Sequence, residues 1–184
     1  MVAACAVQLM TSPAARAQEG VFLNEDQAPA AVFPDATSFA REVVTATPDL
    51  RARMKTILGG MAEPSIWEDQ YVTFKASRGE ALLGYAVIVE EIGKHRPITF
   101  VVGVRPDARV QDVAVMAYRE AYGGEVKSKR FLLQYQGKAQ ADGVQQPTDI
   151  KNIAGATLSV DAASRAVKKA LALAKVAFAV GGQS

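Results

Sequence analysis

A run of small residues ahead of a hydroxyl side chain is the part of this sequence best suited to chemistry. Ala154, Gly155 and Ala156 precede Thr157, and a helical pattern begins close to that threonine. Small side chains let a ligand approach the backbone, and the first turn of a helix offers free N–H groups and a partial positive charge. These features predict a phosphate or anion site. Taken alone, however, they favour simple capping of a helix by Thr157 and Ser159 over a ligand site.

The same run resembles a known family. Residues 154–159 read Ala-Gly-Ala-Thr-Leu-Ser, which resembles the Ser/Thr-Gly-Ala-Thr-x-Ser signature of FMN-binding domains. Such domains occur in the covalently flavinylated, periplasmic subunits of the sodium-pumping NADH:quinone reductase and the Rnf complex, and in small exported relatives. The likeness covers about Leu83 to Leu171. Four further stretches follow in the family's order, at residues 84–86, 93–104, 118–124 and 130–138.

The resemblance implies that FMN is attached covalently, through its phosphate, to Thr157. In the family a FAD-dependent flavinyltransferase makes this bond, so that enzyme is an expected partner. The surrounding signature residues, implied to lie at the cofactor, are Ala154, Gly155, Ala156, Leu158 and Ser159. Two departures stand out. Ala154 occupies a position that is usually Ser or Thr, and Lys151 replaces an acid often found six places before the threonine, so Asp149 would have to serve instead.

A second loop is also implied to lie against the flavin. Glu120, Gly123 and Gly124 match the Glu-Thr-Pro-Gly loop of the family, with Ala121 and Tyr122 in place of its Thr and Pro. Nearby in the family's order, residues 94–96 read Lys-His-Arg and replace a more glycine-rich turn. We interpret their histidine, the single one in the chain, as an exposed loop residue, and Trp67 as a packing residue.

These residues favour an electron carrier over an enzyme. A flavin supplies the redox chemistry, while the protein tethers it and tunes its environment. The sequence has no pyridine-nucleotide fingerprint and no evident acid and base pair. Expected partners are therefore membrane or periplasmic redox proteins. Two alternatives remain open: a small flavin-dependent reductase, and a binding or sensory domain of the same fold without the cofactor.

The elements that must position these residues predict an α+β fold. Four segments rich in Val, Ile, Phe, Tyr and Thr, separated by Gly, Pro or Asp turns, predict an antiparallel meander over residues 71–76, 82–92, 98–104 and 109–118. A long C-terminal helix should begin within two residues of Thr157, with Ser159 as its N-cap and Lys and Arg on the side away from the sheet. Residues 37–47 and 48–58 predict two shorter helices, the second ended by Gly59-Gly60.

The length predicts one compact domain. The charge distribution gives little indication of a nucleic-acid partner. The 184 residues include 21 Lys plus Arg and 19 Asp plus Glu, a net charge of +2, and the basic residues form no long block. We divide the chain into an export signal at 1–17, a linker at 18–36, and a single domain at 37–184 whose residues 37–60 are a helical extension.

The first residues predict export. An apolar stretch from Val2 to Met10 precedes Ala15-Arg16-Ala17, a small-x-small cleavage site, although no positive charge follows Met1. If the true start lies upstream, Cys5 becomes a candidate for a lipid anchor. Otherwise cleavage removes this single cysteine, and the mature chain has no thiol chemistry. The expected location is the periplasm or another exported compartment.

Overall fold

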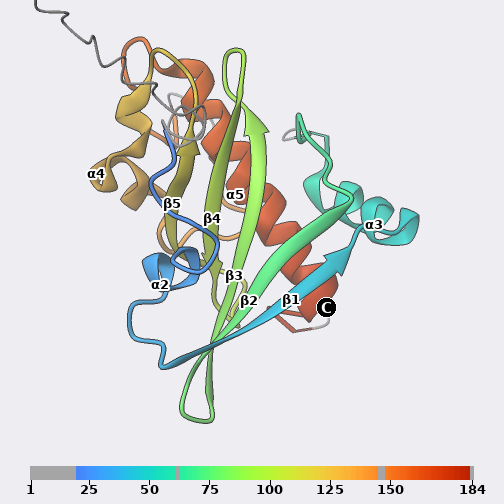
Figure 1. Ribbon diagram of the computed structural model, residues 1–184. Coiled ribbons are helices and arrows are strands. Elements are labelled where there is room, and N and C mark those ends of the chain that lie inside the picture. The colour runs from blue at the N-terminus through green and yellow to red at the C-terminus, as the bar shows by residue number, and fades with distance from the viewer. Residues whose placement is uncertain (1–19, 61–62, 145–147, 183–184) are drawn as a thin grey trace, which may run out of the picture.

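The computed structural model describes residues 20–60, 63–144 and 148–182 (Figure 1). Its centre is one five-stranded antiparallel sheet in which every strand pairs with the next along the chain. The strands are β1 (Ser38–Thr45), β2 (Gln70–Arg78), β3 (Ala81–Ile92), β4 (Pro97–Val104) and β5 (Val110–Tyr118). The helices are α2 (Ala28–Val32), α3 (Pro48–Leu58), α4 (Lys129–Leu132) and α5 (Thr157–Phe178), with short 3-10 turns η1 (Gly124–Lys127) and η2 (Leu133–Tyr135). The predicted α+β fold is confirmed.

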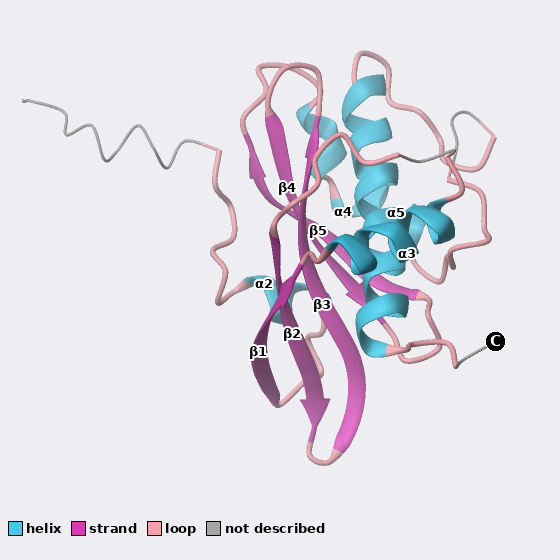
Figure 2. Ribbon diagram, turned by 90° about the vertical axis from the view of Figure 1, so that its right-hand side faces the viewer, coloured by secondary structure: helices cyan, strands magenta, loops and turns pink. Residues whose placement is uncertain are grey.

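The sheet has helices on both faces, because alternate strand residues point to opposite sides. On one face Val87, Val102 and Val113 belong to the main core, together with α3 and α5. On the other face Ala86 and Val101 pack with α2 in a smaller cluster. Figure 2 shows α3 and α5 on one side of the sheet and α2 on the other. The predicted strands of the meander correspond to β2 through β5.

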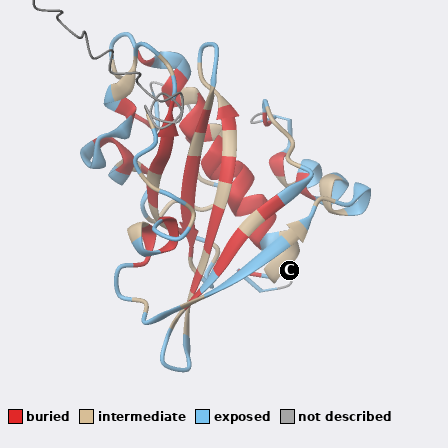
Figure 3. Ribbon diagram, in the orientation of Figure 1, coloured by how far each residue is buried: buried red, intermediate tan, exposed pale blue. Residues whose placement is uncertain are grey.

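The predicted helix at 37–47 is wrong, because this segment forms strand β1. It pairs with β2 from Ser38 opposite Ser77 to Thr45 opposite Gln70. The run Val43-Val44-Thr45 is β-branched, which favours an extended backbone, and the edge of β2 provides hydrogen-bonding partners. Most of β1 is exposed (Figure 3), so burial gave little periodic signal from which to recognise it.

Helix α3 agrees with its prediction. Thr47 caps its N-terminus by accepting a hydrogen bond from the Leu50 N–H, and Gly59 ends it in the left-handed conformation at φ +64°. Met54 and Leu58 are buried. The described part of the predicted linker contains α2 and is held to the sheet, since the Phe22 N–H donates to the Met116 carbonyl.

The outer side of α5 is covered, contrary to the expectation of a solvated basic side. Lys168 and Lys169 are both buried. The Lys168 ammonium donates to the carbonyls of Gln140 and Asp142. The Lys169 ammonium lies 2.9 Å from Glu68 and 3.0 Å from the fully buried Glu91. Glu68 follows α3, Gln140 and Asp142 follow η2, and Glu91 lies in β3. Nothing in the local sequence periodicity indicates that these residues contact the helix.

The predicted export signal at 1–17 and the candidate lipid site at Cys5 lie outside the described residues. Among the residues that the structure describes, none of the helices combines the length and the apolar character needed to cross a bilayer.

Candidate functional site

Thr157 is the first residue of α5, as the small-residue run predicted to within two positions. A tight turn precedes it: Gly155 has φ +80°, and the Ala156 N–H donates to the Ile153 carbonyl at 2.9 Å. Ala156 is the N-cap residue and supplies no side-chain cap. No side chain at the N-cap position therefore accepts a hydrogen bond from the N–H groups of the first turn.

The predicted N-cap role of Ser159 is wrong. Ser159 lies inside the helix and is buried, with its Oγ 3.0 Å from the hydroxyl of Tyr118 at the end of β5. The turn closed at Ala156 starts the helix three residues earlier than a serine cap at position 159 would. Ser159 instead joins the first turn of α5 to the sheet.

The Thr157 side chain is exposed and open to a large reactant. Its neighbours Gly155 and Leu158 are exposed as well, and a Cβ built on Gly155 would meet no atom within 4 Å. Asn152 donates a hydrogen bond from Nδ2 to Thr157 Oγ1 at 3.1 Å. The same amide accepts from the Ile153 N–H at 2.7 Å, which fixes its orientation. The hydroxyl is thus both accessible and held in place.

The structure brings the predicted glycine loop against the start of α5. A Cβ on Gly123 would lie 3.0 Å from Ser159 Oγ, 3.0 Å from the Tyr118 hydroxyl and 3.3 Å from Ala156 Cα. Gly123 has φ +81°, a conformation that glycine adopts without strain. Gly124 follows close to the Lys127 side chain. Two stretches some 30 residues apart in the chain therefore form one surface around Thr157.

Glu120 holds the neighbouring hairpin turn. Its Oε1 accepts hydrogen bonds from the backbone N–H groups of His95 and Arg96, the second at 2.8 Å. Partial burial acts to raise the pKa of the Glu120 carboxyl, but these N–H donors outweigh it and the pKa lies below its ordinary value. His95 itself is exposed, as predicted. Glu120 therefore ties the β3–β4 turn to the loop that leads into Gly123.

Asp149 lies in the loop that precedes Thr157, and its service in place of the missing acid stays a prediction. Its carboxylate lies against Gly143, where an added Cβ would come within 2.2 Å of Oδ2. Lys151 is exposed, and its N–H donates to Gln134 Oε1 at 2.7 Å. Asn152 contacts the threonine, and the sequence pattern assigned it no role. Nor did the pattern assign one to the Tyr118 hydroxyl.

A groove of about 470 Å³ lies next to this site. Such a volume is typical of small-molecule pockets, which run from roughly 300 to 1,000 Å³. One wall comes from the loop before Thr157 and the other from η1, α4 and η2. Its lining residues are Glu125, Ser128, Arg130, Phe131, Gln134, Lys151, Asn152 and Ile153.

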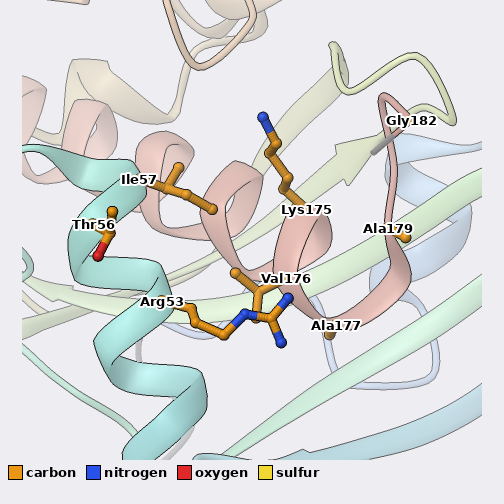
Figure 4. A pocket seen from close by; sticks show the side chains of 8 residues that line it. All are labelled: Arg53, Thr56, Ile57, Lys175, Val176, Ala177, Ala179 and Gly182. Atoms are coloured by element: carbon orange, nitrogen blue, oxygen red, sulfur yellow. The ribbon is translucent and has the colours of Figure 1, made fainter. Parts of the chain in front are cut away.

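A second, larger groove of about 610 Å³ lies at the other end of α5 (Figure 4). It is lined from α3 by Arg53 and Ile57 and from α5 by Lys175 and Val176. Lys175 follows Thr157 by 18 positions in the helix, which is roughly 27 Å along the axis at 1.5 Å per residue. Its polar lining is exposed, and none of the predicted site residues reaches it. Volume alone therefore does not identify the functional site.

Comparison with known protein families gives one match: residues 93–172 match the FMN-binding domain. No curated protein matches the chain. The matched segment begins at the turn held by Glu120 and extends into α5, so it contains the glycine loop, the groove and Thr157. The match supports FMN as the cofactor of this part of the chain.

Proposed function

From the match of residues 93–172 to the FMN-binding domain, we propose that this chain carries FMN covalently on Thr157 and transfers electrons between redox proteins. The observation that carries the proposal is the setting of Thr157. Its exposed hydroxyl opens the longest helix of the described chain, beside an unobstructed Gly155 and a groove of ligand size.

The residues present suit a phosphate ester at Thr157. The first turn of α5 directs backbone N–H groups toward its own start, where negative charge is favoured by about 0.3–1 kcal/mol at an exposed helix end. Arg130 and Lys151 line the adjacent groove and add positive charge. Phe131 and Ile153 supply apolar lining in the same groove. The helix start and these cations would favour a phosphate, and the apolar lining of the groove would favour a flat aromatic ring.

Attachment would require a flavinyltransferase, with FAD as donor. Thr157 Oγ1 would attack the FMN phosphorus of FAD, forming a P–O bond as the diphosphate bond breaks. AMP leaves, and the hydroxyl proton passes to a base of the transferase. Asn152 Nδ2 donates to Oγ1, so it orients the hydroxyl through the oxygen and not through the hydroxyl proton. Small neighbours allow the threonine to enter the active site of the transferase.

Once bound, FMN supplies one- and two-electron chemistry. The protein's own residues position it: Asn152 and the α5 start hold the phosphate end, and Gly123 lets the backbone of the second loop approach. We further propose that the protein works outside the cytoplasm, because its first 17 residues have the pattern of an export signal. A covalent bond suits that location, since lost FMN is not easily replaced there.

The test is co-expression with a flavinyltransferase, followed by intact mass and in-gel flavin fluorescence after denaturation. The wild-type chain and Thr157→Ser should gain the mass of one FMN less one water, and Thr157→Ala should not. Thr148→Ala, at another exposed threonine in the same segment, is the matched control and should be modified fully. A wild-type chain of unchanged mass would contradict the proposal, as would a fluorescent Thr157→Ala band. NADH oxidation by the purified flavoprotein alone would favour the reductase instead.

A further inference from the structure

We propose that the face around Thr157 is a docking surface for an acidic electron-transfer protein. This rests on the carrier function proposed above and names the kind of partner. The surface has two parts. We call the "basic rim" the exposed cations Lys94, Arg96, Lys127, Arg130 and Lys151, and the "apolar centre" the exposed side chains Tyr122 and Leu158.

The rim residues come from three separate segments that the fold brings to one end of the molecule. Figure 1 shows the β3–β4 turn, α4 and the start of α5 at that end. Lys94 and Arg96 belong to the turn that Glu120 holds. The Lys127 ammonium lies 5.3 Å from the centre of the Tyr118 ring, whose hydroxyl reaches Ser159.

The remaining rim residues stand on the groove beside Thr157. Arg130 comes from α4, and Lys151 is next to Asn152, which bonds the threonine. Both side chains are exposed. The rim residues therefore lie on the turn held by Glu120, on η1 and α4, and on the loop that precedes Thr157.

The apolar centre is unusually exposed. Tyr122 is 82% exposed, and Leu158, directly after Thr157, is 48% exposed. Tyr122 is followed by Gly123, which packs on Ala156 and Ser159, so the two apolar side chains flank the same site. Aromatic residues and arginine are enriched in protein interfaces, where an apolar centre is surrounded by a polar rim.

The sign of the rim indicates the charge of the partner. Two acids near this face are already engaged: Asp112 pairs with Lys129, and Glu120 accepts backbone N–H groups. Glu125 lines the groove, but the segments that carry the rim, residues 94–96, 127–130 and 151, contain no acid. Complementary charge steers encounter and orients partners, raising association rates by about 10- to 1,000-fold at low salt. An acidic surface docked here would lie directly over the cofactor site.

The matched probes are cytochrome c, which is basic, and the same protein with succinylated lysines, which is acidic. Binding is measured first on unflavinylated Thr157→Ala protein, so the result does not depend on the cofactor. The succinylated form should bind at least about tenfold more tightly at low salt, with the preference lost as salt screens the charges. On flavinylated protein, reoxidation of the reduced flavin should show the same preference.

Paired charge reversals locate the surface. Lys94→Glu with Arg96→Glu should reverse the preference between the two probes. The backbone N–H of Arg96 that binds Glu120 is retained in this variant. Arg53→Glu with Lys175→Glu makes the same charge change at the far groove of Figure 4 and should leave the preference unchanged.

Three results would overturn the surface: equal binding of both probes, an equal effect of the far pair, or tighter binding to anionic phosphatidylglycerol vesicles than to the acidic protein. If both probes reoxidise the flavinylated protein equally well, that result would contradict the docking surface but not the carrier function. Retained binding of the acidic probe by a wild-type chain that acquires no flavin on co-expression with the flavinyltransferase would contradict the carrier function alone.

Discussion

The hydroxyl of Tyr118, at the end of β5, lies 3.0 Å from Ser159 Oγ in the first turn of α5. The same hydroxyl donates to the Tyr122 carbonyl, so Ser159 must be the donor in the bond between the two side chains. Burial raises the pKa of the Tyr118 phenol above its ordinary value, against a smaller lowering by the Ser159 bond. Tyr118 therefore stays protonated near neutral pH. Its hydroxyl group connects the sheet, the glycine loop and the helix.

Removing the Tyr118 hydroxyl should destabilise the protein around this site. Tyr118→Phe leaves Ser159 and the Tyr122 carbonyl without this partner, which should cost about 1–3 kcal/mol of unfolding free energy. Denaturant unfolding would measure it. Hydrogen exchange should speed up at residues 121–124. Tyr85→Phe is the control, because it keeps the ring that stacks on Phe178, and it should change stability by less than about 0.5 kcal/mol. Equal losses in the two variants would contradict the role given to the Tyr118 hydroxyl.

Gly123 should not tolerate a side chain. In Gly123→Ala the new Cβ would lie 3.0 Å from Ser159 Oγ, and φ +81° would itself be strained. Overpacking costs about 1–3 kcal/mol beyond that strain. Gly137→Ala has nearly the same strain, at φ +77°, but its Cβ would meet nothing within 4 Å. The difference in unfolding free energy between the two variants isolates the contact at the site, and no difference would show that the loop moves aside freely.

Much of this arrangement was predictable from local patterns. Alternation and turn residues located β2 through β5, and the spacing of apolar residues located α5. The helix predicted at 37–47 was wrong because β1 is mostly exposed, and its extended form depends on pairing with β2. That partner lies some 30 residues away and leaves no trace in local periodicity.

The site was predictable in outline but not in contacts. The small-residue run placed Thr157 near a helix start, and the family resemblance placed Gly123 among the site residues. Neither indicated that Asn152 would bond the threonine, that Ser159 would be buried against Tyr118, or that Glu120 would hold backbone N–H groups. Each of these depends on the folded path of the chain. Whether these residues bind FMN stays a prediction.

Glu120 should make stability depend on pH in the acid range. Its pKa is lowered in the folded protein, so its contribution is full above the unfolded-state pKa and is lost as the pH falls through the folded-state pKa. Glu120→Gln removes the charge that the N–H groups of His95 and Arg96 bind. Unfolding free energies of wild type and variant should differ at pH 7 and converge as the pH falls. A constant difference across that range would contradict charge as the source.

Lys169 should be among the most sensitive positions of α5. Its ammonium is fully buried between Glu68 and Glu91, and the Glu91 carboxylate is fully buried too. Lys169→Met leaves that carboxylate with less compensation, and breaking a buried pair costs about 3–5 kcal/mol. Lys175→Met makes the same change at an exposed position of the same helix and should cost less than about 0.5 kcal/mol. Adding Glu91→Gln to Lys169→Met should recover part of the loss, because the uncompensated charge is then gone. If the double variant instead loses the sum of the two single changes, the lysine and the glutamate are not coupled, and packing alone accounts for the sensitivity of Lys169.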